Sequence, residues 1–345
     1  MEGSRLDTAH LLSLTDSFRN KRVAVVGDVV VDEFVYGRVA RVSREAPVLI
    51  LEYDSTEIVP GGAGNAANNV ASLGGKATLV STIGRDAPGR RVVAALHRGV
   101  DTRRLWRVHG AATPVKTRIL AGGVHSAKQQ VVRIDRGVTE PVLPSVRQAF
   151  ERAALEEIGQ SDAVLVSDYG SGLITPAFVT TIRRTLKGVR RRDGLPIPVL
   201  IDTRYRLLKY TGLAACTPNE SEVEEALGIR INDNRRMLER AGREVLARTR
   251  MQAALITRGS RGMALFVRDT PTVHIPIFGS DSIVDVTGAG DTVVSTVALG
   301  LAAGGSIEMA ARLANYTGGL VVMKRGTATV SGAELRQAIK TNDRG

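Results

Sequence analysis

Short apolar runs alternate with longer stretches of helical periodicity along most of the chain. The apolar runs predict buried strands at Arg22–Gly27, Ala77–Ile83, Ala163–Ser167, Pro198–Asp202 and Ala253–Thr257. The stretches between them predict helices at Asn65–Leu73, Pro88–Arg98, Pro176–Val189, Asn234–Ala247 and Thr292–Ala303. This alternation predicts an α/β fold with a doubly wound, mostly parallel sheet flanked by helices. Ligands of such sheets bind beyond the carboxyl ends of the strands.

Two segments, residues 33–58 and 113–134, interrupt the alternation. Both are rich in β-forming residues and have no helical stretch inside them. They predict a small antiparallel sheet that projects from the main domain and forms a lid over the site. Because no internal repeat or low-complexity linker is visible, we expect one domain over residues 21–340, after an N-terminal leader of residues 1–20.

The composition narrows the class of protein. A hydrophobic share of 43% supports a real core, and the single cysteine, Cys216, excludes an internal disulfide framework. Residues 1–20 lack the apolar centre of a signal peptide. No apolar run reaches the roughly 20 residues that a membrane-spanning helix needs. We therefore predict a cytoplasmic protein that does not act at a membrane.

The net charge of +12 raises the question of nucleic acid. The densest groups of arginines, at residues 183–192 and 235–250, lie in helix-like stretches where a solvated face is the usual structure. No aromatic residues alternate with these arginines, as a platform for stacked bases would require. Nucleic acid is therefore not an expected partner, and anionic small substrates explain the basic balance equally well.

The string Asp285–Asp291 (DVTGAGD), directly before a predicted helix, is the strongest chemical signal. Glycines at a helix start let a ligand approach the backbone, where free amides and the positive end of the helix dipole stabilise an anion. Asp291 in the first turn could accept the proton of a hydroxyl while the amides of Gly288, Ala289 and Gly290 stabilise a transferred phosphoryl group. Helix capping is the alternative, but a cap explains one aspartate and not the whole string.

A second glycine-rich string, Gly61–Asn69 (GGAGNAANN), also leads into a predicted helix. Gly61 and Gly62 would admit a ligand close to the backbone, and the amide of Asn65 could bind sugar hydroxyls. A plain turn followed by a helix cap is a comparable explanation for this string taken alone.

These two strings, in this order, resemble the two signatures of the ribokinase (PfkB) family of carbohydrate kinases, and the resemblance extends from about Lys21 to Leu335. It implies an ATP-dependent kinase with a ribokinase-like fold, Asp291 as catalytic base, and ATP and Mg²⁺ as cofactors. A monovalent cation and a homodimer are further expectations. The implied positions are, for sugar binding, Asp32; for Mg²⁺ (indirectly) and phosphates, Asn219 and Glu222; and for the nucleotide, Thr257, Gly259, Thr287 and Asn315.

Within the family, the chain is most similar to the kinase half of the heptose-phosphate kinase/adenylyltransferase enzymes. The strings that carry this similarity include GDVVVDEFVYG, KTRIL, SDYGSG and ARLANYTGGLVVMKRGTATVS. They imply phosphoryl transfer to the anomeric hydroxyl of heptose 7-phosphate, with Asp168 binding the sugar. Without family context, Asp168 could equally end a strand or cap a helix. Lys116 and Arg118 could form a phosphate clamp or a solvated face.

Two departures from that pattern matter. Asp202-Thr203-Arg204 stands where D-P-K is expected, and no nucleotidyltransferase motif precedes the end at Gly345, so adenylyl transfer is not expected. Two alternatives stay open. One is another kinase of the family, acting on ribose, fructose, a fructose phosphate or a nucleoside. The other is a ribokinase-fold protein that binds nucleotide without catalysis.

Overall fold

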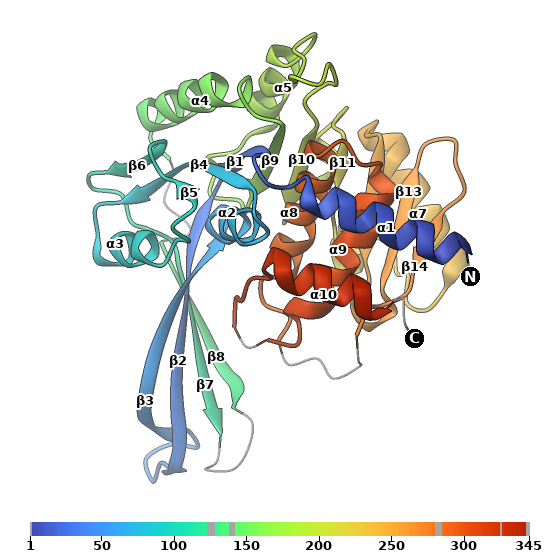
Figure 1. Ribbon diagram of the computed structural model, residues 1–345. Coiled ribbons are helices and arrows are strands. Elements are labelled where there is room, and N and C mark those ends of the chain that lie inside the picture. Colours follow the sequence, from blue (N-terminus) through green and yellow to red (C-terminus); the bar gives the residue numbers. More distant parts are fainter. Residues whose placement is uncertain (1, 123–127, 138–141, 280–284, 325, 343–345) are drawn as a thin grey trace.

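A computed structural model describes residues 2–122, 128–137, 142–279, 285–324 and 326–342. The main sheet contains parallel strands with an antiparallel edge (Figure 1). In spatial order its strands are β14 (Val273–Ile275), β13 (Met263–Val267), β12 (Ala253–Thr257), β11 (Ala215–Cys216), β10 (Val199–Thr203), β9 (Ala163–Asp168), β1 (Arg22–Gly27), β4 (Lys76–Gly84) and β5 (Val100–Asp101). β6 (Leu105–Val108) also pairs with β4. Only the pairs β12–β13 and β13–β14 are antiparallel among these described strands, as a mostly parallel sheet predicts.

Helices cover both faces of this sheet, because its central strands are apolar on both sides. Val23 and Val25 of β1 enter one core, and Ala24 and Val26 enter the other. The first core is covered by α1 (Glu2–Asp16), α2 (Ala63–Ser72), α3 (Ala87–Ala94), α8 (Ala289–Ala302), α9 (Ile307–Val321) and α10 (Gly332–Asn342). The second core is covered by α4 (Pro144–Ile158), α5 (Pro176–Thr185), α6 (Glu220–Leu227) and α7 (Arg235–Thr249).

The N-terminal residues are not a detached leader. α1 buries Leu11 and Leu14 in the first core, and Phe18 follows them there. None of the helices within the described ranges is long and apolar enough to cross a lipid bilayer.

A second, four-stranded sheet projects from the main body beyond α2 and α3 (Figure 1). Its strands, in spatial order, are β3 (Leu49–Gly62), β2 (Val29–Val42), β7 (Val115–Gly122) and β8 (Gln129–Arg136). Both predicted lid segments form antiparallel hairpins, apart from residues 123–127, which lie outside the described residues. The sheet is antiparallel within each hairpin, as predicted, whereas β2 and β7, which join the hairpins, run parallel. We call this sheet the lid.

The C-terminal end of α8 is fixed by a buried arginine. Arg191, whose side chain is 2% exposed, donates from Nη1 to the carbonyls of Leu301 (2.7 Å) and Ala302 (2.9 Å). A cation at a helix C-terminus stabilises both the free carbonyls and the helix dipole. The opposite end of α8 carries the DVTGAGD string, so this contact holds one end of the element that presents the candidate base.

Candidate active site

A cavity of about 540 Å³ lies where the base of the lid meets the main sheet and the N-terminus of α8. It is lined by most of the positions that the sequence singled out: Asp32, Gly62, Asn219, Glu222, Thr257, Gly259, Thr287, Gly288, Ala289, Gly290, Asp291 and Asn315. These residues come from segments far apart in the chain, and the fold brings them together at one edge of the sheet, as doubly wound sheets do.

The backbone at the start of α8 leaves amides facing the cavity. Gly288 caps the helix at φ 78°, in the left-handed region that favours glycine. The amide of Ala289 donates to the carbonyl of Val286. The amides of Gly290 and Asp291 have no acceptor among the described residues, which is the usual state of the first helical turn. This turn can therefore bind an anion.

The carboxylate of Asp291 is buried and held on both sides. Asn65 Nδ2 donates to its Oδ2 (2.8 Å), and the hydroxyl of Tyr169 donates to its Oδ1 (2.9 Å). Burial raises the pKa of Asp291 to about 6, against the lowering effect of these two hydrogen bonds; nearby Asp32 raises it further. Asp291 is therefore mostly ionised at neutral pH yet basic enough to accept a proton.

The orientation of Asn65 is fixed by residues behind it. Its Oδ1 accepts from Asn69 Nδ2 (3.1 Å), and Asn69 Oδ1 accepts from the Thr292 hydroxyl (2.9 Å). The expectation that Asn65 offers its amide to sugar hydroxyls therefore changes: the amide donates to the candidate base, and Asn65 does not line the cavity. This chain of side chains links α2 to α8.

Positions 61 and 62 need glycine, because neighbouring atoms leave no room for a side chain at Gly61 or Gly62. A Cβ on Gly61 would lie 2.4 Å from Oδ2 of Asp32. Gly62 has φ 57°, and a Cβ there would lie 2.5 Å from the carbonyl oxygen of Asp28. The glycines thus let β3 pass beside Asp32 and bring α2 to the cavity. Gly62 lines the cavity, whereas Gly61 packs behind Asp32.

The expectation that Asp168 contacts the sugar is revised. The Asp168 carboxylate points into the second core, where it accepts from the hydroxyls of Thr203 (3.0 Å) and Tyr210 (2.5 Å). It is not among the described residues that line the cavity. The next residue, Tyr169, contacts Asp291 instead, and its backbone amide donates to Asp28 (2.8 Å). Tyr169 was not among the predicted site residues, although the string SDYGSG contained it.

Four basic side chains of the lid and the sheet edge line the cavity, and three of them have an acidic partner. Arg118 pairs with Asp32, Arg133 with Asp135 and Arg204 with Glu222. Lys116 has no acidic partner within 4 Å in the described part of the chain; its ammonium lies over the ring of Tyr169, 5.1 Å from the centroid. Burial lowers the pKa of Lys116. Lys116 is thus the cation most available to an anionic ligand.

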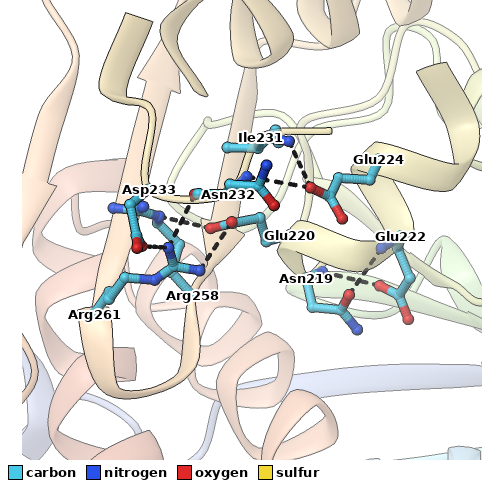
Figure 2. Close-up of polar contacts among 9 residues, drawn as sticks. All are labelled: Asn219, Glu220, Glu222, Glu224, Ile231, Asn232, Asp233, Arg258 and Arg261. Atoms are coloured by element: carbon cyan, nitrogen blue, oxygen red, sulfur yellow. Dashed lines mark hydrogen bonds and ion pairs between the residues drawn. The ribbon is translucent and has the colours of Figure 1, made fainter. Parts of the chain in front are cut away.

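Four of the positions expected to bind nucleotide line the cavity together, and we call them the nucleotide wall: Asn219, Glu222, Thr257 and Gly259. Asn219 and Glu222 form a reciprocal capping box at the start of α6, with each side chain accepting from the other's backbone amide (Figure 2). Thr257 ends β12, next to Asn219, and its amide donates to the carbonyl of Pro218 (3.0 Å). The expected nucleotide positions therefore form one continuous surface.

Two more positions complete this wall. Asn315 lines the cavity from α9 and donates to the carbonyl of Pro276 (2.8 Å). Asp202, at the end of β10, also lines it, and burial raises its pKa well above the usual range, reinforced by the charges of Asp291 and Glu222. Although Asp202-Thr203-Arg204 differs from the expected D-P-K, its aspartate therefore still lies in the site.

The fold is that of the ribokinase-like carbohydrate kinases, and the family match agrees with it. Residues 20–333 match the pfkB family of carbohydrate kinases, and the chain belongs to this family. It is 39% identical over 341 residues to the bifunctional protein HldE of Trichlorobacter lovleyi, covering 98% of this chain and 67% of that protein. It is 39% identical over 327 residues to the bifunctional protein HldE of Caulobacter vibrioides, covering 94% and 65%. The chain thus spans about two thirds of the length of these relatives.

Solved structures share the fold at lower sequence identity. Ribokinase of Arabidopsis thaliana, complexed with ribose and ATP, superposes with a TM-score of 0.69 at 19% identity, covering 93% of this chain and 99% of that one. Phosphofructokinase-2 of Escherichia coli superposes with a TM-score of 0.72 at 16% identity, covering 94% and 99%. These structures share the fold, and the family match makes the class of protein a carbohydrate kinase, as the two glycine-rich strings predicted.

Proposed function

We propose that this protein transfers the γ-phosphoryl group of ATP to the anomeric hydroxyl of heptose 7-phosphate. The observation that carries the proposal is the buried carboxylate of Asp291 in a helical turn whose amides at Gly290 and Asp291 are free. The 36–39% identity to proteins named HldE supports the choice of sugar.

In this proposal each wall of the cavity has its own task. Asp291 accepts the proton of the attacking hydroxyl, with Tyr169 and Asn65 fixing the carboxylate. The amides of the first turn of α8 stabilise charge on the phosphoryl group in transit. Asp32 binds sugar hydroxyls from the lid, and closure of the lid excludes water that would otherwise hydrolyse ATP. Phosphoryl transfer depends mainly on such positioning and charge stabilisation.

The oxygen donors on the nucleotide wall fit Mg²⁺. Asp202, Glu222 and Asn219 line the cavity together with Thr217, whose buried hydroxyl has no hydrogen-bond partner among the described residues. No group of three or more acidic, histidine or cysteine side chains in the described ranges could hold a metal by itself. Mg²⁺ typically binds through one or two carboxylates plus substrate phosphates, where it neutralises phosphate charge. A monovalent cation and a cytoplasmic location stay predictions.

The distal phosphate of the acceptor is expected to bind at Lys116, Arg118 and Arg204. Arg133 also lines the cavity, whereas Arg44, in the turn between β2 and β3, is exposed and does not line it. Each charge-assisted contact contributes about 1.5–3 kcal/mol. Loss of the phosphate should therefore lower kcat/KM at least about tenfold.

The test compares kcat/KM for heptose 7-phosphate, the unphosphorylated heptose, ribose and fructose 6-phosphate. Lys116→Met removes one of the three contacts and should reduce the preference for the phosphorylated sugar at least about tenfold. Lys76→Met, at an exposed lysine at the start of β4, should leave the preference unchanged. Equal or better use of an unphosphorylated sugar would shift the assignment to another kinase of the family. ATP binding without turnover on any acceptor would favour a non-catalytic protein.

The rate should depend on pH through Asp291. Because its pKa is about 6, kcat/KM for the acceptor should fall about tenfold per unit below pH 6 and level off above pH 7. Tyr169→Phe removes a hydrogen bond that lowers this pKa, so the acid limb should move to higher pH. Profiles of kcat/KM from pH 5 to 8 for the wild type and the variant measure the shift. If the acid limbs coincide, Tyr169 does not influence the pKa of the base.

We also propose a homodimer that forms through the lid. Its strands and their connecting turns expose apolar side chains at Val39, Val42, Val48, Leu49, Tyr53, Val131, Val132 and Ile134. Many exposed apolar side chains on one small sheet favour contact with another protein, and a second copy is the commonest partner. Sedimentation should give the mass of two chains, and Val132→Lys with Ile134→Lys should give one. A wild-type monomer at assay concentration would exclude this arrangement.

A further inference from the structure

Glu220 is a buried carboxylate next to the nucleotide wall that none of the roles above uses. It lies in the first turn of α6, between the cavity-lining residues Asn219 and Glu222. Its side chain is 11% exposed and reaches the arginines of the loop after β12 (Figure 2). It does not line the cavity. There Oε2 accepts from Arg258 Nε (2.8 Å) and Oε1 accepts from Arg261 Nη2 (2.9 Å).

The two arginines belong to the same short loop as two glycines that line the cavity. Gly259 and Gly262 both line the cavity and both have positive φ, at 56° and 76°. The amide of Arg258 donates to the carbonyl of Gly262 (2.9 Å), which closes the loop into a tight turn. Glu220 therefore contacts this turn on both sides of Gly259.

The network continues to the turn between α6 and α7. Arg261 Nη1 donates to the carbonyl of Asn232 (2.9 Å) and pairs with Asp233. Glu224 Oε1 accepts from the amide of Ile231 (2.5 Å), which fixes the same turn to α6 (Figure 2). α6, the turn after it and the loop after β12 are thus joined by charged contacts whose centre is Glu220.

Because the carboxylate of Glu220 is buried, its charge needs these cationic partners for stabilisation. Arg258 is 13% exposed, so both ions of that pair are largely removed from water. Removing one partner of such a pair leaves an uncompensated charge, and the segment carrying it must rearrange. The segment here is a glycine-containing loop of the site, whose backbone freedom is otherwise large.

We propose that Glu220 is a positioning residue for nucleotide binding: it holds the Gly259 turn against the Asn219–Glu222 capping box. This inference rests on the proposed assignment of that wall to ATP. Without the contacts of Glu220, the loop adopts other conformations. The affinity for ATP then falls in proportion to the fraction of molecules whose loop remains in the binding conformation. The acceptor wall, formed by the lid and α8, does not depend on this contact.

The test is the isosteric variant Glu220→Gln, with Glu225→Gln as control because Glu225 is exposed on the same helix. Binding of a non-hydrolysable ATP analogue with Mg²⁺ is measured by calorimetry. We expect Kd to rise about tenfold in Glu220→Gln and to change less than about twofold in Glu225→Gln. In turnover, KM for ATP should rise while kcat and KM for the acceptor stay near wild type.

Every other outcome is decisive. A folded Glu220→Gln with unchanged Kd, or an equal rise of both KM values, overturns the proposal, because general loosening does not distinguish the two substrates. If Glu220→Gln does not fold, Arg261→Met replaces it, since Arg261 is 40% exposed and supplies only one of the two contacts. Arg261→Met should raise the Kd for the ATP analogue about threefold, and an unchanged Kd refutes the positioning role of Glu220. Wild-type protein that does not bind the analogue refutes the proposed function instead.

Discussion

Replacement of Asp291 by asparagine is expected to lower kcat about 10²–10⁴-fold while ATP still binds. The amide has the shape of the carboxylate but cannot accept the proton of the acceptor hydroxyl. The hydroxyl of Tyr169 can still donate to the amide oxygen, so the change costs one contact, that with Asn65. The free amides of the helix turn belong to the backbone and are unaffected, and therefore the loss should fall on the chemical step.

Two measurements separate this expectation from simple misfolding. Affinity for a non-hydrolysable ATP analogue should remain close to that of wild type, as should the melting temperature. Asp269→Asn, at an exposed turn between β13 and β14, makes the same chemical change away from the cavity and should be fully active. Turnover of Asp291→Asn within about threefold of wild type, less than 1 kcal/mol of barrier, would remove Asp291 from the role of base.

Local patterns predicted the elements of the main sheet well. Arg22–Gly27 and Ala253–Thr257 form strands with the predicted bounds, because a short apolar run of β-forming residues favours a strand buried on both faces. The helix predicted at Asn65 begins two residues earlier, at Ala63, since Gly62 with its positive φ is the N-cap. The helix predicted to reach Arg98 ends at Ala94. Helix ends depend on such single residues.

The candidate base was predictable because its neighbours are local. Asp291 and the glycines before it form one continuous string, so the helix turn that they build is contained in the sequence. Tyr169 was not predictable in this way: its hydroxyl meets Asp291 from 122 positions away. Nor does the sequence show which of Asp168 and Tyr169 faces the cavity, because neighbouring residues at a strand end point to opposite sides.

The lid shows the same division between local and distant contacts. Each hairpin is local and lies on one of the two segments that were predicted to form a small antiparallel sheet. The parallel pairing of β2 with β7 joins residues more than 70 positions apart, such as Val31 and Val115. That pairing brings Lys116 and Arg118 beside Asp32, where both line the cavity. Their role as a phosphate clamp stays a prediction.

Gly290→Val is expected to lower kcat/KM at least about 10²-fold in a protein that folds normally. The backbone of Gly290 lies outside the left-handed region, and a Cβ there would meet no other part of the described structure within 4 Å. The open space is the cavity next to the free amides, where the transferred phosphoryl group must approach. A valine side chain would occupy that space and keep the phosphoryl group away from its hydrogen-bond donors.

Gly288 differs from Gly290 in that a side chain at Gly288 would disturb the fold itself. Its φ is 78°, and a Cβ would lie 2.6 Å from both Asn65 Nδ2 and Thr327 Cγ2, so Gly288→Val should lower stability as well as activity. Gly290→Val should keep the wild-type melting temperature, as should the control Gly159→Val, at an open position with φ −69° after α4. Melting curves and kcat/KM for the three variants test the distinction. A fully active Gly290→Val would show that the phosphoryl group does not reach these amides, and the anion site would then have to lie elsewhere in the cavity.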